Sequence, residues 1–130
     1  MRNCKLTIIT NSGSITSTFQ ADAVWEEIEE GERVRYQIEG DEGELVFVDN
    51  SMTMSRRGNC TLQATFLEGR QSEMILSDSS LLGSIPVRTT KYHLQKQDEK
   101  RTVELSYELF AADNIQTFSL KILLFFSEEK

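Results

Sequence analysis

The chain has 130 residues, of which 21 are acidic and 14 basic, so its net charge is −7. This length predicts one domain, residues 1–130, whose single core buries about two thirds of the unfolded surface. The negative charge argues against binding to nucleic acid or to anionic membranes, and no segment approaches the ~20 apolar residues of a membrane span. We expect a cytoplasmic protein, because no apolar stretch is long enough for a signal peptide. The two cysteines, Cys4 and Cys60, form no CxxC pair and should then be reduced thiols.

Apolar and polar residues alternate along most of the chain, which predicts β-strands. In the first half, strands are expected over residues 5–10, 14–28, 33–39 and 44–49, with turns between them. Ile28 breaks the phase of its strand, so a bulge is expected near Glu26 and Glu27. Residues 40–43 should form a turn because they contain two glycines.

The segment Ser51–Phe66 has the pattern of a β-hairpin. Met52, Met54 and Arg56 share one parity, and Arg57-Gly58-Asn59 has the composition of a tight turn. The returning strand places Cys60 in phase with apolar residues, which favours a core position for its thiol over a reactive one. Arg56 is the exception in this hairpin, a cation in phase with two methionines.

Further strands are expected over residues 71–77, 85–94, 103–109 and 118–126, with a slip of register near Thr89 and Thr90. The seven glycines fall at predicted turns or strand starts, which agrees with a ladder of hairpins. About 8–10 strands joined by short turns predict an all-β fold, an antiparallel meander closed into a barrel. A two-sheet sandwich is the competing architecture, and the short local connections favour the barrel.

The order and spacing of several short motifs resemble a known family. The motifs are Arg56-Arg57-Gly58, then Phe66 with Glu68-Gly69, then Gly83, the strand Val87–Thr90, Leu105-Ser106-Tyr107-Glu108-Leu109 and a terminal apolar strand. From about Trp25 to Phe126 this pattern is similar to the YwiB-like family of small, uncharacterised bacterial proteins. The resemblance implies a calycin-like (lipocalin-like) β-barrel, a bacterial cytoplasmic setting and an internal cavity, but no established activity or ligand. Around Ser77–Gly83 the chain departs from the family pattern, which has a Tyr and a Thr-Pro pair there.

No arrangement of residues predicts catalysis or metal binding. His93 is the only histidine and faces solvent by parity, and Cys60 points the other way. The acidic residues at 26–32 and at 41–44 lie at predicted turns, where solvated charge is the ordinary explanation. We therefore predict no catalytic residue, no metal ligand and no cofactor.

Arg56 is the sharpest candidate for a special role. A guanidinium inside a barrel must be paired or heavily hydrogen-bonded. The preferred interpretation is a structural closure in which Arg56 stacks on Trp25, the only tryptophan. The alternative is that Arg56 binds the carboxylate or phosphate of a ligand at the barrel mouth.

Tyr36 and Tyr107 point inward by phase and would be polar groups among apolar walls. The candidate ligand-binding residues are therefore Trp25, Tyr36, Arg56 and Tyr107. Leu81 and Leu82, in the loop at 77–84, are either a lid over the opening or a pair that pins the loop to the rim.

Three hypotheses about function follow. The first is a non-catalytic binder of a small apolar, amphipathic or anionic ligand; the second is an interaction or assembly module with a filled barrel; an enzyme ranks third. Residues 122–126 are apolar on both faces, so Leu123 and Phe125 should point outward. We expect a homodimer through that face.

Overall fold

The computed structural model describes residues 1–77, 82–111 and 113–127, with the backbone alone of Leu82. These residues contain ten strands and no helix, and so no helix able to cross a membrane. The strands are β1 (Arg2–Ser12), β2 (Ile15–Ile28), β3 (Gly31–Ile38), β4 (Asp41–Val48), β5 (Ser51–Arg57), β6 (Thr61–Leu67), β7 (Gln71–Ser77), β8 (Leu82–Gln97), β9 (Lys100–Ala111) and β10 (Asn114–Phe126).

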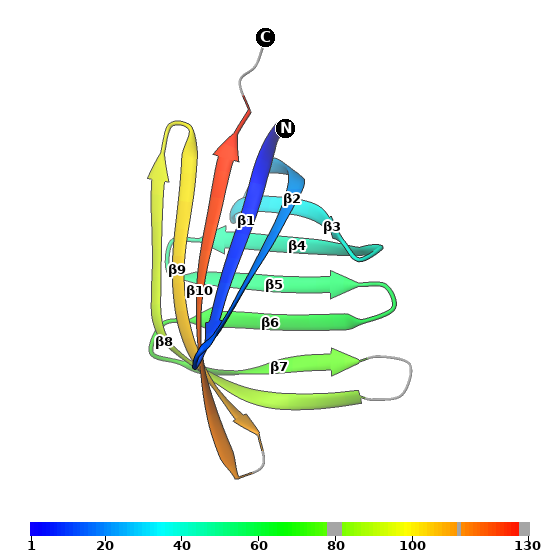
Figure 1. Ribbon diagram of the computed structural model, residues 1–130. Helices are drawn as coiled ribbons and strands as arrows, with labels where there is room; N and C mark the ends of the chain where they lie inside the picture. Colours follow the sequence, from blue (N-terminus) through cyan, green and yellow to red (C-terminus); the bar gives the residue numbers. More distant parts are fainter. Residues whose placement is uncertain (78–81, 112, 128–130) are drawn as a thin grey trace.

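Each strand pairs antiparallel with the next, and β1 also pairs with β10, so the meander closes into a barrel. The prediction of an all-β, closed antiparallel meander is confirmed. In Figure 1, β8, β9, β10 and β1 run roughly upright, whereas β4–β7 run across them. Two long strands connect these two groups. β2 pairs with β1 and with β3, and β8 pairs with β7 and with β9.

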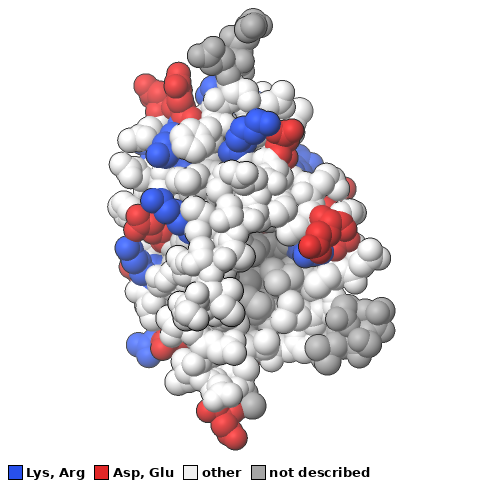
Figure 2. Space-filling view, viewed as in Figure 1, with Lys and Arg blue, Asp and Glu red and all other residues white. Residues whose placement is uncertain are grey.

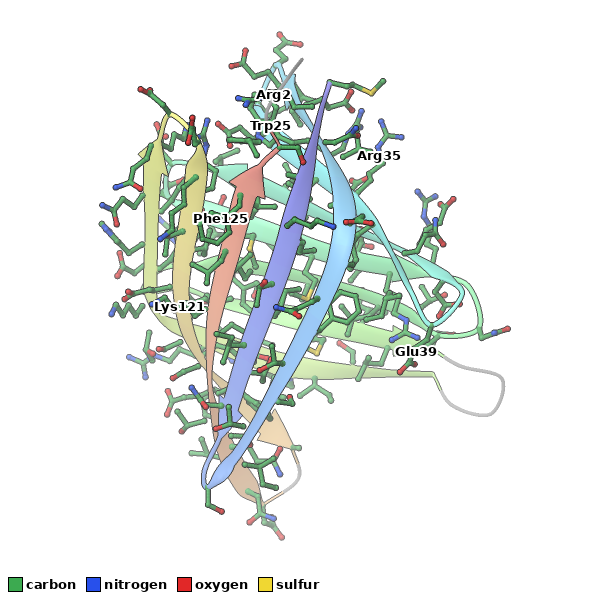
Figure 3. All side chains as sticks on the ribbon, turned by 45° about the horizontal axis from the view of Figure 1, so that its top comes forward. Arg2, Trp25, Arg35, Glu39, Lys121 and Phe125 are labelled. Atoms are coloured by element: carbon green, nitrogen blue, oxygen red, sulfur yellow. The ribbon has the colours of Figure 1, made fainter. Side chains whose placement is uncertain are left out.

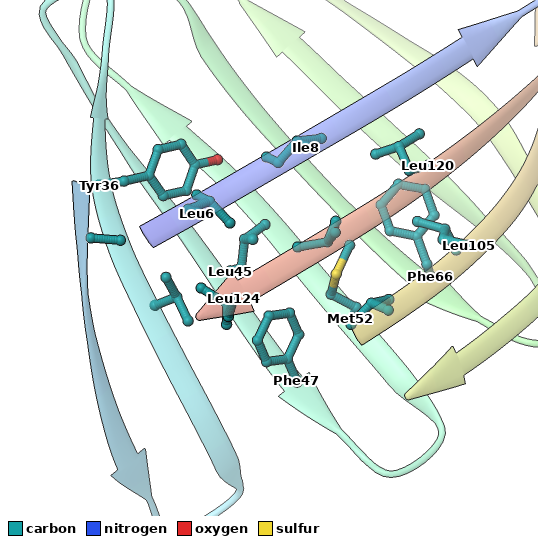
Figure 4. Packing of buried hydrophobic residues seen from close by; sticks show 14 of the residues in the cluster. Leu6, Ile8, Tyr36, Leu45, Phe47, Met52, Phe66, Leu105, Leu120 and Leu124 are labelled. Carbon is teal, nitrogen blue, oxygen red and sulfur yellow. The ribbon is translucent and has the colours of Figure 1, made fainter. Parts of the chain in front are cut away.

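The core consists of inward-facing side chains, which follow the period of two predicted from the sequence. Phe47, Phe66, Leu45, Met52 and Leu124 are among the fully buried ones, and they interdigitate in the barrel as Figure 4 shows. Burial of such apolar surface is the main driving force of folding. The interior is packed with side chains over much of its length.

Two predicted irregularities have different outcomes. The register between β8 and β9 shifts between Thr89 and Lys91, which confirms the predicted slip. The predicted bulge at Glu26 and Glu27 is wrong, because β2 pairs with β3 in unbroken register through both residues. Ile28 breaks the apolar phase simply because it faces outward, half-buried, at the end of its strand.

Candidate functional site

One end of the barrel leaves inward-facing apolar side chains partly open to solvent. We call these residues the mouth: Phe19, Ala21, Ile38, Met54, Leu62, Leu76 and Phe118. They come from β2, β3, β5, β6, β7 and β10, and each shares its parity with buried residues of the same strand. Figure 2 shows the molecule hollowed beside β2, with mostly uncharged surface around the hollow. The mouth is therefore an apolar recess.

Aromatic contacts join the mouth to the core. The ring of Phe19 lies 5.8 Å from that of Tyr36, and Phe118 stacks on Tyr107 at 5.3 Å. Both tyrosines are buried and face inward, as their phase predicts. Burial raises the pKa of Tyr36 and raises that of Tyr107 to about 12. Both phenols are therefore neutral at pH 7 and can donate or accept one hydrogen bond.

Gly43 makes room for Tyr36. A Cβ atom at this position would clash with the Tyr36 ring, which lies against the backbone of β4. The sequence predicted a turn at 40–43, but the turn is shorter and Gly43 lies inside β4. Its role is close approach rather than turn geometry.

Arg56 pairs with carboxylates, not with Trp25, so the predicted stacking is wrong. Its Nε donates to Asp41 Oδ2 at 2.9 Å, and its Nη2 donates to Glu39 Oε2 at 3.3 Å. Asp41 also accepts hydrogen bonds from the backbone N–H groups of Asn59 at 2.9 Å and Cys60 at 3.3 Å. One buried carboxylate thus holds both Arg56 and the β5–β6 turn.

These contacts lower the pKa of Asp41. The hydrogen bond from the Asn59 N–H has the largest effect, and the one from the Arg56 guanidinium has the next largest. Gly58 belongs to the same arrangement, since a Cβ there would collide with the Asp41 carboxylate and its φ is +150°. Cys60 is half-buried beside the turn and is not part of the core, contrary to its predicted phase. It precedes β6 and donates its N–H to Asp41.

The partner of Trp25 is Arg101, at the opposite end of the barrel, which we call the closed end. The Arg101 guanidinium carbon lies 5.8 Å from the centre of the Trp25 ring and 5.0 Å from that of Phe126. Glu32 joins the two: it accepts from Trp25 Nε1 at 3.0 Å and from Arg101 Nε at 2.9 Å. Figure 3 shows Trp25 beside Arg2 at this end, away from Glu39.

An arginine therefore packs on Trp25, but it is Arg101 and not Arg56, which the sequence had indicated. Asp41 and Glu32 were interpreted as solvated turn charges, and both are buried. The available signal was parity: Asp41 is in phase with Leu45 and Phe47, and Glu32 with Val34. A carboxylate in phase with core residues needs a cation or several N–H donors.

A second depression lies on the outer surface where β2 separates from β3. We call it the fork groove; it has a volume of about 660 Å³, and Lys5, Asp22, Arg35, Gln37, Glu42 and Arg57 are among its lining residues. Lys5 pairs with Asp22, and Arg35 Nη2 lies 2.7 Å from Glu26 Oε1. The groove reaches Tyr36 from outside, whereas Tyr107 and Arg56 are not on its lining.

The remaining sequence-based candidates stand as follows. Leu81 lies outside the described residues, as does the side chain of Leu82, so the lid stays a prediction. Phe125 is 45 % exposed and Leu123 half-buried on the outward face of β10, in agreement with their phase; the homodimer stays a prediction. His93 is exposed, as expected. Within the described ranges no three His, Cys, Asp or Glu side chains gather as a metal site would require.

Comparisons with known proteins place the chain among uncharacterised relatives. A search of curated proteins finds no match. The fold is similar to the crystal structure of the ywiB protein from Bacillus subtilis, with a TM-score of 0.66 over 97 % of this chain and 91 % of that chain, at 9 % identity. The family model for a domain of unknown function, DUF1934, matches residues 7–122. The chain therefore belongs to the DUF1934 family, and the YwiB-like resemblance expected from its sequence is confirmed.

Proposed function

We propose that the protein is a non-catalytic binder of a small apolar or amphipathic molecule, which enters the barrel at the mouth. The observation that carries this proposal is the contrast between the two ends of the barrel. Val34, Phe47 and Leu124, which face inward towards the closed end, are fully buried. Their counterparts at the mouth, such as Leu62 and Leu76, remain partly exposed although they face inward.

A recess of this kind suits an apolar ligand. Burying apolar surface contributes about 25 cal/mol per Å², and ligand sites are mostly apolar walls with a few polar groups. The neutral hydroxyls of Tyr36 and Tyr107 lie behind the mouth and supply such groups. A cytoplasmic location belongs to the proposal, and it is supported by two unpaired thiols, Cys4 and Cys60.

The ligand should carry no essential negative charge. Arg56 is 24 % exposed at the side chain, but Asp41 and Glu39 already share its charge. An anion would have to compete with a carboxylate that is 2 % exposed and bonded through two further N–H groups. We therefore assign Arg56 a structural role in holding the β5–β6 turn.

Binding of the fluorescent apolar probe N-phenyl-1-naphthylamine tests the proposal. The variant Leu76→Gln places a polar amide in the mouth and should weaken probe binding by about tenfold, because burying a leucine contributes about 1.5–3 kcal/mol and 1.4 kcal/mol is a factor of ten. The measurement is a fluorescence titration on protein whose fold is checked by circular dichroism.

The matched control is Ile75→Gln on the same strand. Ile75 is the adjacent residue, points outward and is exposed, so this change should leave probe affinity within about twofold. Equal affinities of the two variants, or no probe binding by the unmodified chain, would refute a binding mouth. Loss in Leu76→Gln alone supports it.

A further inference from the structure

One stretch of β2 lacks a strand on one side. β2 (Ile15–Ile28) pairs with β1 from Ile15, opposite Ser12, to Trp25, opposite Arg2. Its pairing with β3 begins only at Ala23, opposite Tyr36. Within the part of the chain that the structure describes, residues 15–22 therefore have an edge that no strand covers. We call this the free edge.

The free edge carries few of the features that usually prevent pairing with another chain. Strand edges are commonly blocked by proline, lysine or a bulge. Residues 15–22, Ile-Thr-Ser-Thr-Phe-Gln-Ala-Asp, contain no proline and no lysine, and they pair with β1 in unbroken register. Their one charged residue is Asp22, at the end, which forms an ion pair with Lys5. The segment is thus a regular template.

The free edge lies beside two depressions that could accommodate the side chains of an added strand. On the inner face, Phe19 and Ala21 belong to the mouth, so the edge runs beside the apolar recess. At its end the edge meets the fork groove, whose lining includes Asp22, Ala23 and Tyr36. A strand laid along the edge would have one face over the mouth and its end in the groove.

We propose that an extended peptide segment of a partner protein adds to the free edge of β2 as an additional strand. Backbone N–H and C=O groups along an edge alternate as donors and acceptors, and a peptide main chain satisfies them all. Alternate side chains of that peptide then enter the mouth. The proposal goes beyond small-molecule binding, because it uses the backbone of β2, although both occupants share the mouth.

The chemistry of the edge defines the partner. Eight residues at about 3.4 Å each give an edge of about 27 Å, which matches a peptide of about eight residues. Its inward side chains should be apolar at every second position, and its flanks basic. The chain has a net charge of −7, and at the mouth one cation, Arg56, faces two carboxylates, Asp41 and Glu39, so positive flanks are attracted.

A nine-residue probe peptide tests the proposal: acetyl-Lys-Thr-Val-Thr-Phe-Thr-Val-Thr-Lys-amide. Two matched controls carry N-methyl groups, one on the Val and Phe residues and the other on the four Thr residues. Because successive N–H groups of a strand point to opposite edges, one methylated set removes the donors that face β2 and the other leaves them. The readouts are affinity by calorimetry and amide hydrogen exchange by NMR.

The expected result is binding of the unmodified peptide, with alternate amides of residues 15–22 exchanging at least about tenfold more slowly than in the unbound protein. One methylated peptide should lose at least about tenfold in affinity, and the other should bind normally. Absence of binding, protection confined to other strands, or equal behaviour of both methylated peptides would overturn the proposal.

N-phenyl-1-naphthylamine binding measured on the same sample separates the two ideas. If the naphthylamine binds and the peptide does not, the inference fails and the proposed small-molecule function stands. If the peptide binds and displaces the naphthylamine, both occupants use the mouth. If neither binds, both proposals fail.

Discussion

Two buried carboxylates hold the two ends of the barrel, and each depends on an arginine. At the mouth Asp41 holds Arg56 and two backbone N–H groups. At the closed end Glu32 holds Arg101 and the indole N–H of Trp25. The planar guanidinium suits both places, because it donates several hydrogen bonds and also packs against rings.

At the residue level, replacing Arg101 tests whether the buried carboxylate of Glu32 depends on its arginine. Its side chain is 13 % exposed and lies against Trp25 and Phe126. In Arg101→Met the Glu32 carboxylate stays buried and, among the described residues, keeps the Trp25 N–H and the more distant Lys96, whose Nζ lies 3.8 Å away. We expect a loss of roughly 3 kcal/mol in the free energy of unfolding, measured with urea.

The control for this loss is Arg35→Met, which removes an exposed ion pair with Glu26. Exposed pairs contribute less than about 1 kcal/mol, so this variant should unfold almost as the unmodified chain does. The double variant Arg101→Met with Glu32→Gln removes the stranded charge and should regain part of the lost stability. Equal losses in the two single variants would contradict a special role for Glu32.

At the level of elements, β2 consists of segments that differ in which neighbouring strands they pair with. Among the described residues, 23–25 are paired on both edges, with β1 and β3, whereas residues 15–22 pair with β1 alone and residues 26–28 with β3 alone. A proline scan can reveal this directly. Ser17 and Thr18 are adjacent, exposed residues, so neither loses core packing when replaced. Their N–H groups point to opposite edges, one towards β1 and one towards the free edge.

Ser17→Pro and Thr18→Pro should therefore differ sharply in stability. The proline that removes a hydrogen bond to β1 should cost at least roughly 2 kcal/mol of unfolding free energy, and the other less than about 1 kcal/mol. Urea unfolding of the two variants measures the difference. Similar, large losses in both would mean that the edge is covered in solution and would remove the basis for strand addition.

At the level of the whole molecule, alternation and turn residues were enough to predict the meander and its closure. Parity also placed Tyr36, Tyr107 and Arg56 inside correctly. It could not say which inward groups meet, because that depends on how far each residue lies along the barrel axis. Arg56 is level with Gly43 and Tyr36 in the ladder, so Asp41 reaches it and Trp25 does not.

The free edge was equally beyond prediction from the sequence. A strand's pattern gives its length and buried face, but the point at which pairing with β3 ends depends on how strongly the barrel bends there. The same holds for Gly43. The composition of residues 40–43 suggested a turn, but a glycine is needed at position 43 because the Tyr36 ring lies against the backbone there. Local pattern predicts elements, and packing decides where they separate.

The acid stability of the whole barrel should depend on Asp41. Its native pKa lies below the value of about 3.9 expected for the unfolded chain. The ionised carboxylate therefore stabilises the native state above about pH 4, and this contribution is lost as the pH falls through the native pKa. In Asp41→Asn it is absent at every pH, so the gap in urea midpoint between this variant and the unmodified chain should shrink as the pH is lowered from 6 to 3.

Glu104→Gln is the control for Asp41→Asn, because it removes a paired carboxylate that is exposed instead of buried. The pKa of Glu104 is also lowered, by the Lys91 ammonium, but both partners are solvent-exposed. Salt at about 0.5 M should screen that surface pair and remove its effect, whereas the Asp41 effect should persist, because backbone N–H groups and a half-buried guanidinium supply it. If salt removed both effects alike, Asp41 would act as a surface charge, and the β5–β6 turn would need another anchor.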